Sequence, residues 1–248
     1  KRAPNEPLTR MTFGASSGGQ GTVAADLGRR FGEQNQFGVR LNAAKRAGET
    51  GVDEEDQTLD MFALGLDYQG DRLRLSADIG HQYHFIDNPR PSVTPNGGLP
   101  SAPDADDNFA QPWTYSKEKQ TFGTFRAEYD FTDAVTGWLA AGVREGEEQN
   151  RLANPRATAS GTTTASRFDN YREDSIFTSE AGLRMRLQTG AVSHQLVTSA
   201  AIFDSQEKGA NQFYAPVAGN LYDSFDAALP TTVTYDGGDL SDPHVTER

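Results

Sequence analysis

The sequence has no cysteine among its 248 residues. This absence excludes a disulfide framework, a cysteine-ligated zinc or iron-sulfur site and a thiol nucleophile. Positive charge is also scarce, since 23 Lys and Arg stand against 35 Asp and Glu, which gives a net charge of −12. Nucleic-acid binding rests largely on a basic surface, so this balance argues against a nucleic-acid partner.

Long hydrophobic runs are missing too. Only 35% of the residues are hydrophobic and the mean hydropathy is −0.66. No stretch approaches the roughly 18 to 20 apolar residues of a membrane helix, which excludes a helical membrane protein. A transmembrane β-barrel is not excluded, because its strands alternate apolar and polar residues and keep the mean hydropathy low.

What the sequence does contain is a period of two. Apolar residues occupy the odd positions of residues 37–43, 73–79, 125–131 and 177–187 apart from Ser179, and polar residues or Gly occupy the even positions. This alternation is typical of strands with one apolar and one polar face, whereas a helix needs apolar residues every three or four positions. We predict an all-β antiparallel meander of about nine strands, near residues 7–15, 21–32, 37–47, 59–69, 72–86, 118–131, 136–146, 175–188 and 193–205.

The connections between these strands alternate in length. Short turns fall at residues 32–36, 69–71, 132–135 and 189–191, and they are rich in Gly, Asp, Asn and Thr. The long connections are predicted near residues 87–116 and 147–174, and a third long external segment near 206–248. Since every second connection is short, all tight turns lie at one end of the sheet, as in an outer-membrane barrel with short periplasmic turns and long external loops.

The two faces of the strands support the barrel. Aromatic residues beside the turns predict a girdle at the lipid headgroups: Phe31, Phe37, Tyr68, Phe131 and Trp138. The polar faces carry many charges, which suit a wide lumen filled by water or by a plug domain. Those of the predicted lumen are Arg40, Arg72, Arg74, Asp78, Arg126, Glu128, Arg184 and Arg186. A soluble β-sandwich with an aromatic core is the alternative.

Four segments carry a family resemblance: residues 1–4 (KRAP), 37–48 (FGVRLNAAKRAG), 64–78 (LGLDYQGDRLRLSAD) and 194–198 (HQLVT). In order and spacing they resemble the TonB-dependent outer-membrane receptors, most closely the ferric-siderophore receptors. One small departure is Ser199, where a Gly is usual. The resemblance implies a barrel of about 22 strands around a plug domain. Residues 1–248 would be a partial barrel that lacks the plug, and we expect such an open sheet not to insert stably alone.

The resemblance also implies the function. The complete protein would be an outer-membrane transporter that takes up a ferric siderophore, energised through TonB, in contact with its own plug domain and with outer-membrane lipid. No cofactor is expected and the protein is expected not to be an enzyme. The lumen charges named above would face the plug. Ligand-binding candidates, on the upper lumen face and beside the long loops, are Gln82, His84, Trp113, Tyr115 and Tyr171.

The sequence patterns for a metal site are weaker. Asp78, His81 and His84 suggest a metal site, yet residues 81 and 84 of one strand point to opposite faces, so we predict none. The acidic run at residues 104–108 lacks the Gly and the distant Glu of a calcium loop. The alternatives that stay open are a small outer-membrane or secreted β protein acting as an adhesin, and a carbohydrate-binding module that stacks sugars on Trp113 and Tyr115.

Overall fold

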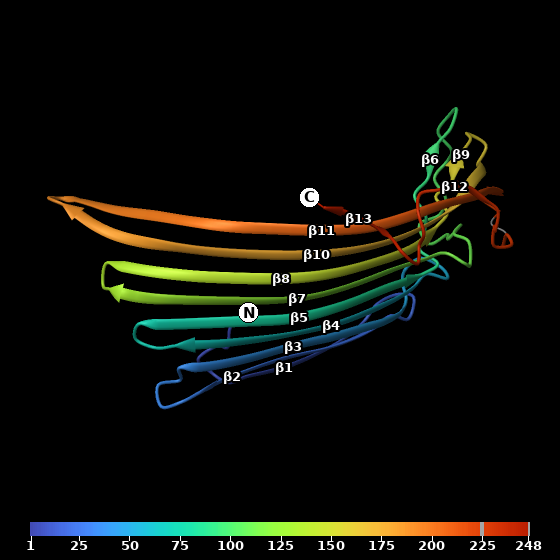
Figure 1. Ribbon diagram of the computed structural model, residues 1–248. Coiled ribbons are helices and arrows are strands. Elements are labelled where there is room, and N and C mark those ends of the chain that lie inside the picture. Colours follow the sequence, from blue (N-terminus) through green and yellow to red (C-terminus); the bar gives the residue numbers. More distant parts are fainter. Residues whose placement is uncertain (224–225, 248) are drawn as a thin grey trace.

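The computed structural model describes residues 1–223 and 226–247 and contains one antiparallel β-sheet (Figure 1). Nine long strands follow one another as a meander, each hydrogen-bonded to the next: β1 (Leu8–Ala15), β2 (Gly21–Phe31), β3 (Phe37–Glu49), β4 (Asp56–Gln69), β5 (Leu73–Asp87), β7 (Tyr115–Thr132), β8 (Val135–Leu152), β10 (Thr162–Thr189) and β11 (Val192–Asn220). The predicted all-β antiparallel meander is confirmed, and the sheet formed by the described residues does not close on itself. Across the described residues, no helix is long and apolar enough to cross a membrane.

Two ends of the sheet differ in their connections. Four tight turns, between β2 and β3, β4 and β5, β7 and β8, and β10 and β11, lie at the left in Figure 1, which we call the turn end. Gly32 (φ 94°) and Gly190 (φ 60°) supply the left-handed backbone that two of these reversals need. The longer connections lie at the right, which we call the loop end.

Four short strands extend the sheet at its edges: β6 (Thr94–Pro95), β9 (Arg156–Ala157), β12 (Val233–Asp236) and β13 (His244–Glu247). β6 pairs with β9 in parallel, and β9 pairs with β10. β12 and β13 both pair with β11. They lie along parts of its free edge, so β11 is only partly open.

The register of the strand pairs places apolar residues beside apolar residues on one face of the sheet. One row of paired residues crosses seven strands and is apolar throughout: Phe37, Tyr68, Leu75, Ala127, Leu139, Ala181 and Ala200. A slip of one residue in any pair would turn the whole apolar set of that strand to the other face. We call the face that carries this row the outer face, and the opposite one the inner face.

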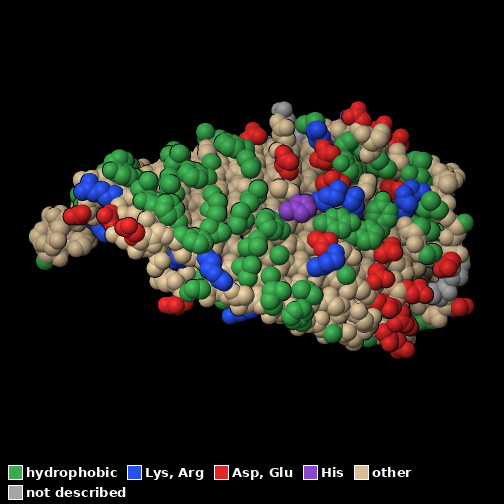
Figure 2. Space-filling view, turned by 90° about the horizontal axis from the view of Figure 1, so that it is seen from below, with side chains coloured by type: hydrophobic (Ala, Val, Ile, Leu, Met, Phe, Trp, Pro, Cys, Tyr) green, Lys and Arg blue, Asp and Glu red, His purple; other side chains and the backbone are tan. Residues whose placement is uncertain are grey.

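The outer face is apolar yet uncovered. Leu139 is 52% exposed and Ile202 is 63% exposed. Figure 2 shows hydrophobic side chains gathered over the half of the molecule toward the turn end, with charged side chains gathered toward the loop end. A β-sandwich would cover this face with a second sheet, but the described residues form a single layer. A wide, bare apolar band is the surface that a bilayer covers.

Several strands run further than the alternation predicts. Residues 147–152 continue β8, residues 162–174 begin β10 and residues 206–220 complete β11. Beyond the apolar band both faces meet water, so the apolar period disappears while the backbone ladder continues. The strands therefore project past the band at the loop end.

A small core forms at the loop end, where the long connections pack on the tops of β10 and β11. Ala157, Ala210 and Leu221 are buried there. Arg167, also buried, is paired with Asp169, and this pairing holds the pKa of the guanidinium above its usual value.

The loop-end connections are bonded to one another. Several hydrogen bonds join them, among them Thr94 N to Pro155 O (2.9 Å), Asp53 N to Asp106 O (2.8 Å), Trp113 Nε1 to Ala227 O (3.0 Å) and Tyr222 Oη to Ser101 O (3.0 Å). The connections after β3, β5, β8 and β11 therefore form one linked layer.

Candidate functional site

The inner face becomes a continuous polar wall toward the loop end. Its rows follow the same register as the outer face, and one row runs from His84 through Glu118 and Glu148 to Arg172. We call this surface the upper inner wall. Its polar members on β5, β7, β8, β10 and β11 are Gln82, His84, Ser116, Glu118, Gln120, Arg144, Glu148, Asn150, Asn170, Arg172, Asp174, Glu207 and Asn211.

Glu148 is the centre of a hydrogen-bonded network in this wall. Its carboxylate accepts hydrogen bonds from Asn150 Nδ2 at 2.5 Å and from Asn170 Nδ2 at 3.5 Å. Asn150 Oδ1 in turn accepts a hydrogen bond from Ser116 Oγ at 2.7 Å. The guanidinium of Arg172 lies 3.8 Å from the other oxygen of Glu148. Side chains from three strands are thus held in fixed positions on the inner face.

Asp174 forms a second cluster with the two arginines of the wall. Its carboxylate lies 2.5 Å from Arg144 Nη2 and 3.8 Å from Arg172 Nη2. Two polar atoms are left over, because Arg144 Nε and Asn170 Oδ1 are buried without a hydrogen-bond partner among the described residues. A buried donor and a buried acceptor without partners are groups that a bound solute or water can satisfy.

Sequence reasoning missed most of this wall. It ended one strand at residue 146 and began another at 175, so Glu148, Asn150, Asn170 and Arg172 fell into a predicted loop. The only signal in the sequence was the parity of the position along the strand. Asn170 and Arg172 lie an even number of residues from Arg184, a predicted lumen residue of the same strand, and Glu148 and Asn150 pair with them on β8.

Two of the predicted ligand-binding residues, Gln82 and His84, lie on the upper inner wall. Gln57 of β4 holds the ring of His84, with Gln57 Nε2 at 2.6 Å from His84 Nε2. Gln20, from the turn between β1 and β2, donates to Gln57 Oε1 at 3.1 Å. His84 is therefore a positioned side chain of the inner face.

The predicted aromatic residues lie elsewhere. Trp113 belongs to the connection between β5 and β7, where its indole N–H is bonded within the linked layer. Tyr115 and Tyr171 lie on the outer face, beyond the apolar band, in register with Arg151 and Gln149 respectively. The structure does not bring these three aromatics together with the histidine of the inner wall.

Both tyrosines have partners on their own face. Arg151 lies over the ring of Tyr115 at 5.4 Å. Tyr171 Oη donates to Glu173 Oε1 at 2.6 Å, and this bond to a carboxylate raises the pKa of Tyr171 to about 12. Tyr171 is thus a neutral hydrogen-bond donor at physiological pH.

The predicted lumen charges line the inner face nearer the turn end. All but Arg72 are on inner-face strand positions: Arg40, Arg74, Asp78, Arg126, Glu128, Arg184 and Arg186. Arg72 lies in the turn between β4 and β5. Arg74 contacts Asp130 at 2.6 Å and Arg126 contacts Glu128 at 2.7 Å. The inner face is therefore a lattice of ion pairs, and contact of these charges with a plug stays a prediction.

Trp138 corrects the predicted girdle. Phe37 and Tyr68 do lie together on the outer face, with ring centroids 5.0 Å apart. The prediction was wrong for Trp138, whose indole N–H donates to Glu180 Oε1 at 2.9 Å on the inner face. Leu139 takes the outer position on this strand, so the tryptophan next to it must face inward.

The segment before β1 lies against the inner face. Arg2 reaches Asp78 through both terminal nitrogens, each at 2.6 Å from a carboxylate oxygen. Two arginines of the inner face, on β2 and β3, hold its backbone: Arg30 Nη1 donates to Ala3 O at 3.0 Å, and Arg40 Nη1 donates to Arg2 O at 2.8 Å. Residues 1–4 are therefore bound to the sheet rather than extended into solvent.

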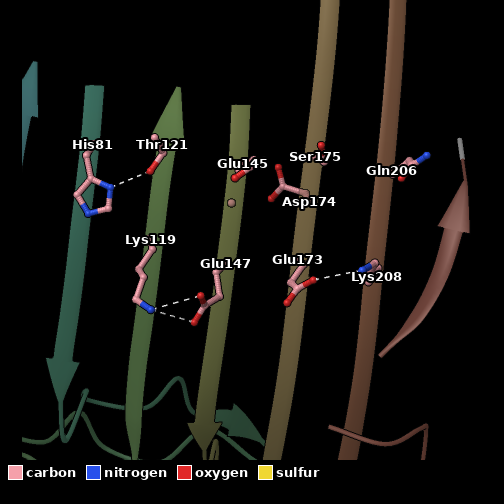
Figure 3. A pocket seen from close by; sticks show the side chains of 11 residues that line it. His81, Lys119, Thr121, Glu145, Glu147, Glu173, Asp174, Ser175, Gln206 and Lys208 are labelled. Carbon is pink, nitrogen blue, oxygen red and sulfur yellow. Dashed lines mark hydrogen bonds and ion pairs between the residues drawn. The ribbon is translucent and has the colours of Figure 1, made fainter. Parts of the chain in front are cut away.

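A depression of about 470 Å³ lies on the outer side of the sheet, just beyond the apolar band (Figure 3). Two ion pairs line it, Lys119 with Glu147 at 3.3 Å and Lys208 with Glu173 at 3.6 Å. His81 of this depression faces away from His84. Within residues 1–223 and 226–247, no three His, Asp or Glu side chains gather as metal ligands. Since the depression opens away from the lumen, the upper inner wall is the better candidate site.

Fold and site together define the class of the chain. A one-layer antiparallel sheet with a bare apolar band outside and a charged wall inside is a segment of a large barrel of the bacterial outer membrane. The comparisons with known proteins agree with this class: the chain is similar to the barrel segments of siderophore receptors, and the resemblance seen in the sequence is confirmed. No family model matches the chain.

The relatives are named as receptors rather than enzymes. The chain is 34% identical over 252 residues to the ferrichrome receptor FcuA of Yersinia enterocolitica, a match that covers 100% of this chain and 33% of that protein. The ferric preacinetobactin receptor BauA of Acinetobacter baumannii shares the fold with a TM-score of 0.86 at 28% identity, over 96% of this chain and 37% of that chain. The ferripyoverdine receptor of Pseudomonas aeruginosa matches with a TM-score of 0.77 at 13% identity, over 100% of this chain and 34% of that one, which is a likeness of fold alone. The chain spans about a third of the length of these relatives. They give no support to an adhesin or a carbohydrate-binding module.

Proposed function

We propose that this chain forms part of the wall of an outer-membrane transporter that takes up a ferric siderophore, energised through TonB in the complete protein. The observation that carries the proposal is the upper inner wall, a fixed polar network on the lumen side of a barrel segment that is similar along its whole length to a ferrichrome receptor. Transport changes the location of a solute and not its bonds, so the wall needs binding groups and no catalytic ones.

Each face then has its own role. The apolar band of the outer face contacts lipid, and the linked connections at the loop end, residues 88–114, 153–161, 221–223 and 226–243, face the outside. The ion pairs nearer the turn end, such as Arg74 with Asp130, face the plug domain. A ferric siderophore is bound as an intact chelate, so a metal-ligand cluster in the protein is not required.

Iron uptake tests the proposal. Cells that depend on the complete receptor containing this chain are expected to accumulate radioactive iron from a ferric siderophore. Deletion of the receptor gene, or of tonB, is expected to lower the uptake to background. Uptake that is unchanged without the receptor, while the receptor is present and folded in the control strain, would contradict a role in iron transport.

Variants of the upper inner wall test the site. H84A combined with Q82A is expected to weaken binding of the transported siderophore about tenfold, since a lost hydrogen bond costs about 1 to 1.5 kcal/mol. Y83A, between them in sequence but on the outer face, is the matched control and should change the dissociation constant less than twofold. Binding measured by isothermal titration decides the matter, and equal effects of the two variants would remove these residues from the site.

A further inference from the structure

Residues 1–4 lie along a row of paired residues on the inner face. An added Cβ at Gly28 of β2 would lie 2.8 Å from Pro4 Cδ, and one at Gly65 of β4 would lie 2.6 Å from Lys1 O. Both glycines belong to one row of the register, which we call the seat row: Gly28, Arg40, Gly65, Asp78, Thr124, Gly142 and Thr178. The segment therefore occupies the space that side chains at Gly28 and Gly65 would fill.

This segment crosses the strands of the sheet in order. From Pro4 back to Lys1 it passes from β2 to β4, and Arg2 reaches Asp78 of β5, beside which Figure 1 marks the N-terminus. The three residue steps of an extended chain span about 10 Å, and the two strand spacings from β2 to β4 also span about 10 Å. The segment is therefore extended and perpendicular to the strands. Chain that continues before Lys1 in this direction meets β5, β7 and β8 next.

The seat row continues beyond Asp78 as a trough. Its volume is about 350 Å³, and it is lined by Thr124, Gly142 and Thr178 and, on the side of residues 1–4, by Arg2. The atom nearest to an added Cβ at Gly142 is Thr178 Cγ2 at 3.3 Å. Small side chains and a glycine therefore form the floor of the trough, as Gly28 and Gly65 do under residues 1–4.

Each part of the seat row is bordered by an arginine. Arg30 and Arg126 belong to the neighbouring row toward the turn end, and Arg30 donates to Ala3 O at 3.0 Å. Arg126 lines the trough. Among the described residues, the contacts of Arg126 with Glu128 use Nε and Nη2, which leaves Nη1 to donate to a backbone carbonyl oxygen as Arg30 does.

We propose that the stretch of the complete receptor directly before Lys1 lies in this trough as an extended segment, with about its fourth residue before Lys1 beside Gly142. The three strand spacings from β4 to β8 measure about 14 Å, which four extended residues span. The inference rests on the proposed function, in which this chain is part of a longer receptor, and adds the surface that the preceding segment fits. Asp78 of the seat row lies roughly 20 Å along β5 from His84, so the segment leaves the upper inner wall open to a solute.

Disulfide formation in the complete receptor tests the proposal. Residues 1–248 contain no cysteine, and any cysteine elsewhere in the receptor is first replaced by serine. Cysteines at the third, fourth and fifth residues before Lys1 are expected to form a disulfide with G142C, most readily at the fourth, because the Cα atoms come within about 7 Å. They are expected not to pair with G123C, which lies on the outer face of β7 in register with Val143. T124C with G142C, paired across β7 and β8, is the positive control for oxidation.

The outcomes separate this inference from the proposed function. If none of the three cysteines pairs with G142C while T124C with G142C is oxidised, the proposal is overturned, and equal pairing with G123C overturns it too. Uptake of a radioactive ferric siderophore is measured on the cysteine-free receptor. A receptor that transports iron but forms no such disulfide loses only this inference, whereas a receptor that forms the disulfide and transports no iron contradicts the proposed function alone.

A bulky side chain in the trough gives a second test on folded receptor. G142L fills the trough and is expected to raise about tenfold the rate at which a maleimide reagent labels a cysteine at the fourth residue before Lys1, because the segment loses its place on the wall. G123L adds the same side chain on the outer face, where an added Cβ lies 3.6 Å from Val143 Cγ2, and should change the rate less than about twofold. Equal labelling rates in G142L, G123L and the parent receptor would show that the segment does not lie against Gly142.

Discussion

Replacing Asp67 with alanine is expected to lower the free energy of unfolding of the complete receptor by about 3 to 5 kcal/mol, because it leaves the charge of Arg30 buried without its counterion. The two side chains are each only 3% exposed, and Arg30 Nη2 donates to Asp67 Oδ2 at 2.6 Å. The remaining contacts of Arg30, with the carbonyl oxygens of Asn35 and Ala3, carry no negative charge to replace the carboxylate. Urea unfolding of the receptor in lipid vesicles measures the change.

The same strand offers the control. Asp60 pairs with Lys45 at 2.8 Å on the outer face, where the two side chains are 44% and 62% exposed. Exposed ion pairs contribute at most about 1 kcal/mol, so D60A should change the stability little. A similar loss of stability in D60A and D67A would show that burial of the pair is not what matters.

The second large effect is expected from a charge placed on the outer face, which should destabilise the folded receptor in the membrane. L139R puts a guanidinium into the apolar band, at a cost of about 2 to 4 kcal/mol near the middle of the bilayer. The neighbouring variant A140R puts the same group on the inner face, in register with Glu180, and is expected to be tolerated. The measurement is the amount of folded receptor in the outer membrane for each variant. Folded receptor is recognised because it resists unfolding in detergent until it is heated. A140R more harmful than L139R would reverse the assignment of the faces.

The sequence predicts the faces because lipid and lumen impose opposite demands on alternate residues. Where both demands act, as at Leu139 beside Ala140 or along residues 177–187, the period of two is clear and the strands were placed correctly. Trp138 shows the limit of composition: an aromatic near a turn was assigned to the lipid surface, although its position next to Leu139 requires the inner face.

Beyond the bilayer the demand for apolar residues ends, and with it the signal. β8 and β10 continue as strands there, with polar residues on both faces, so the network around Glu148 was hidden in a predicted loop. Parity still applies in such regions. Tyr115 is ten residues from Phe125 and Tyr171 is six from Phe177, which places both on the outer face once the strands are known to be continuous.

The hydrogen bonds among the loop-end connections bear on how such a receptor can be re-engineered. Trp113 donates to the backbone beyond β11, Tyr222 donates to the backbone after β5, and residues 94 and 155 share a backbone bond. A graft of one connection from another receptor would break the partners of the other connections. We therefore expect that ligand specificity can be transferred between receptors only by transplanting all connections of the linked layer together. Chimaeras with a single grafted connection are expected to lose order in the connections that were not replaced.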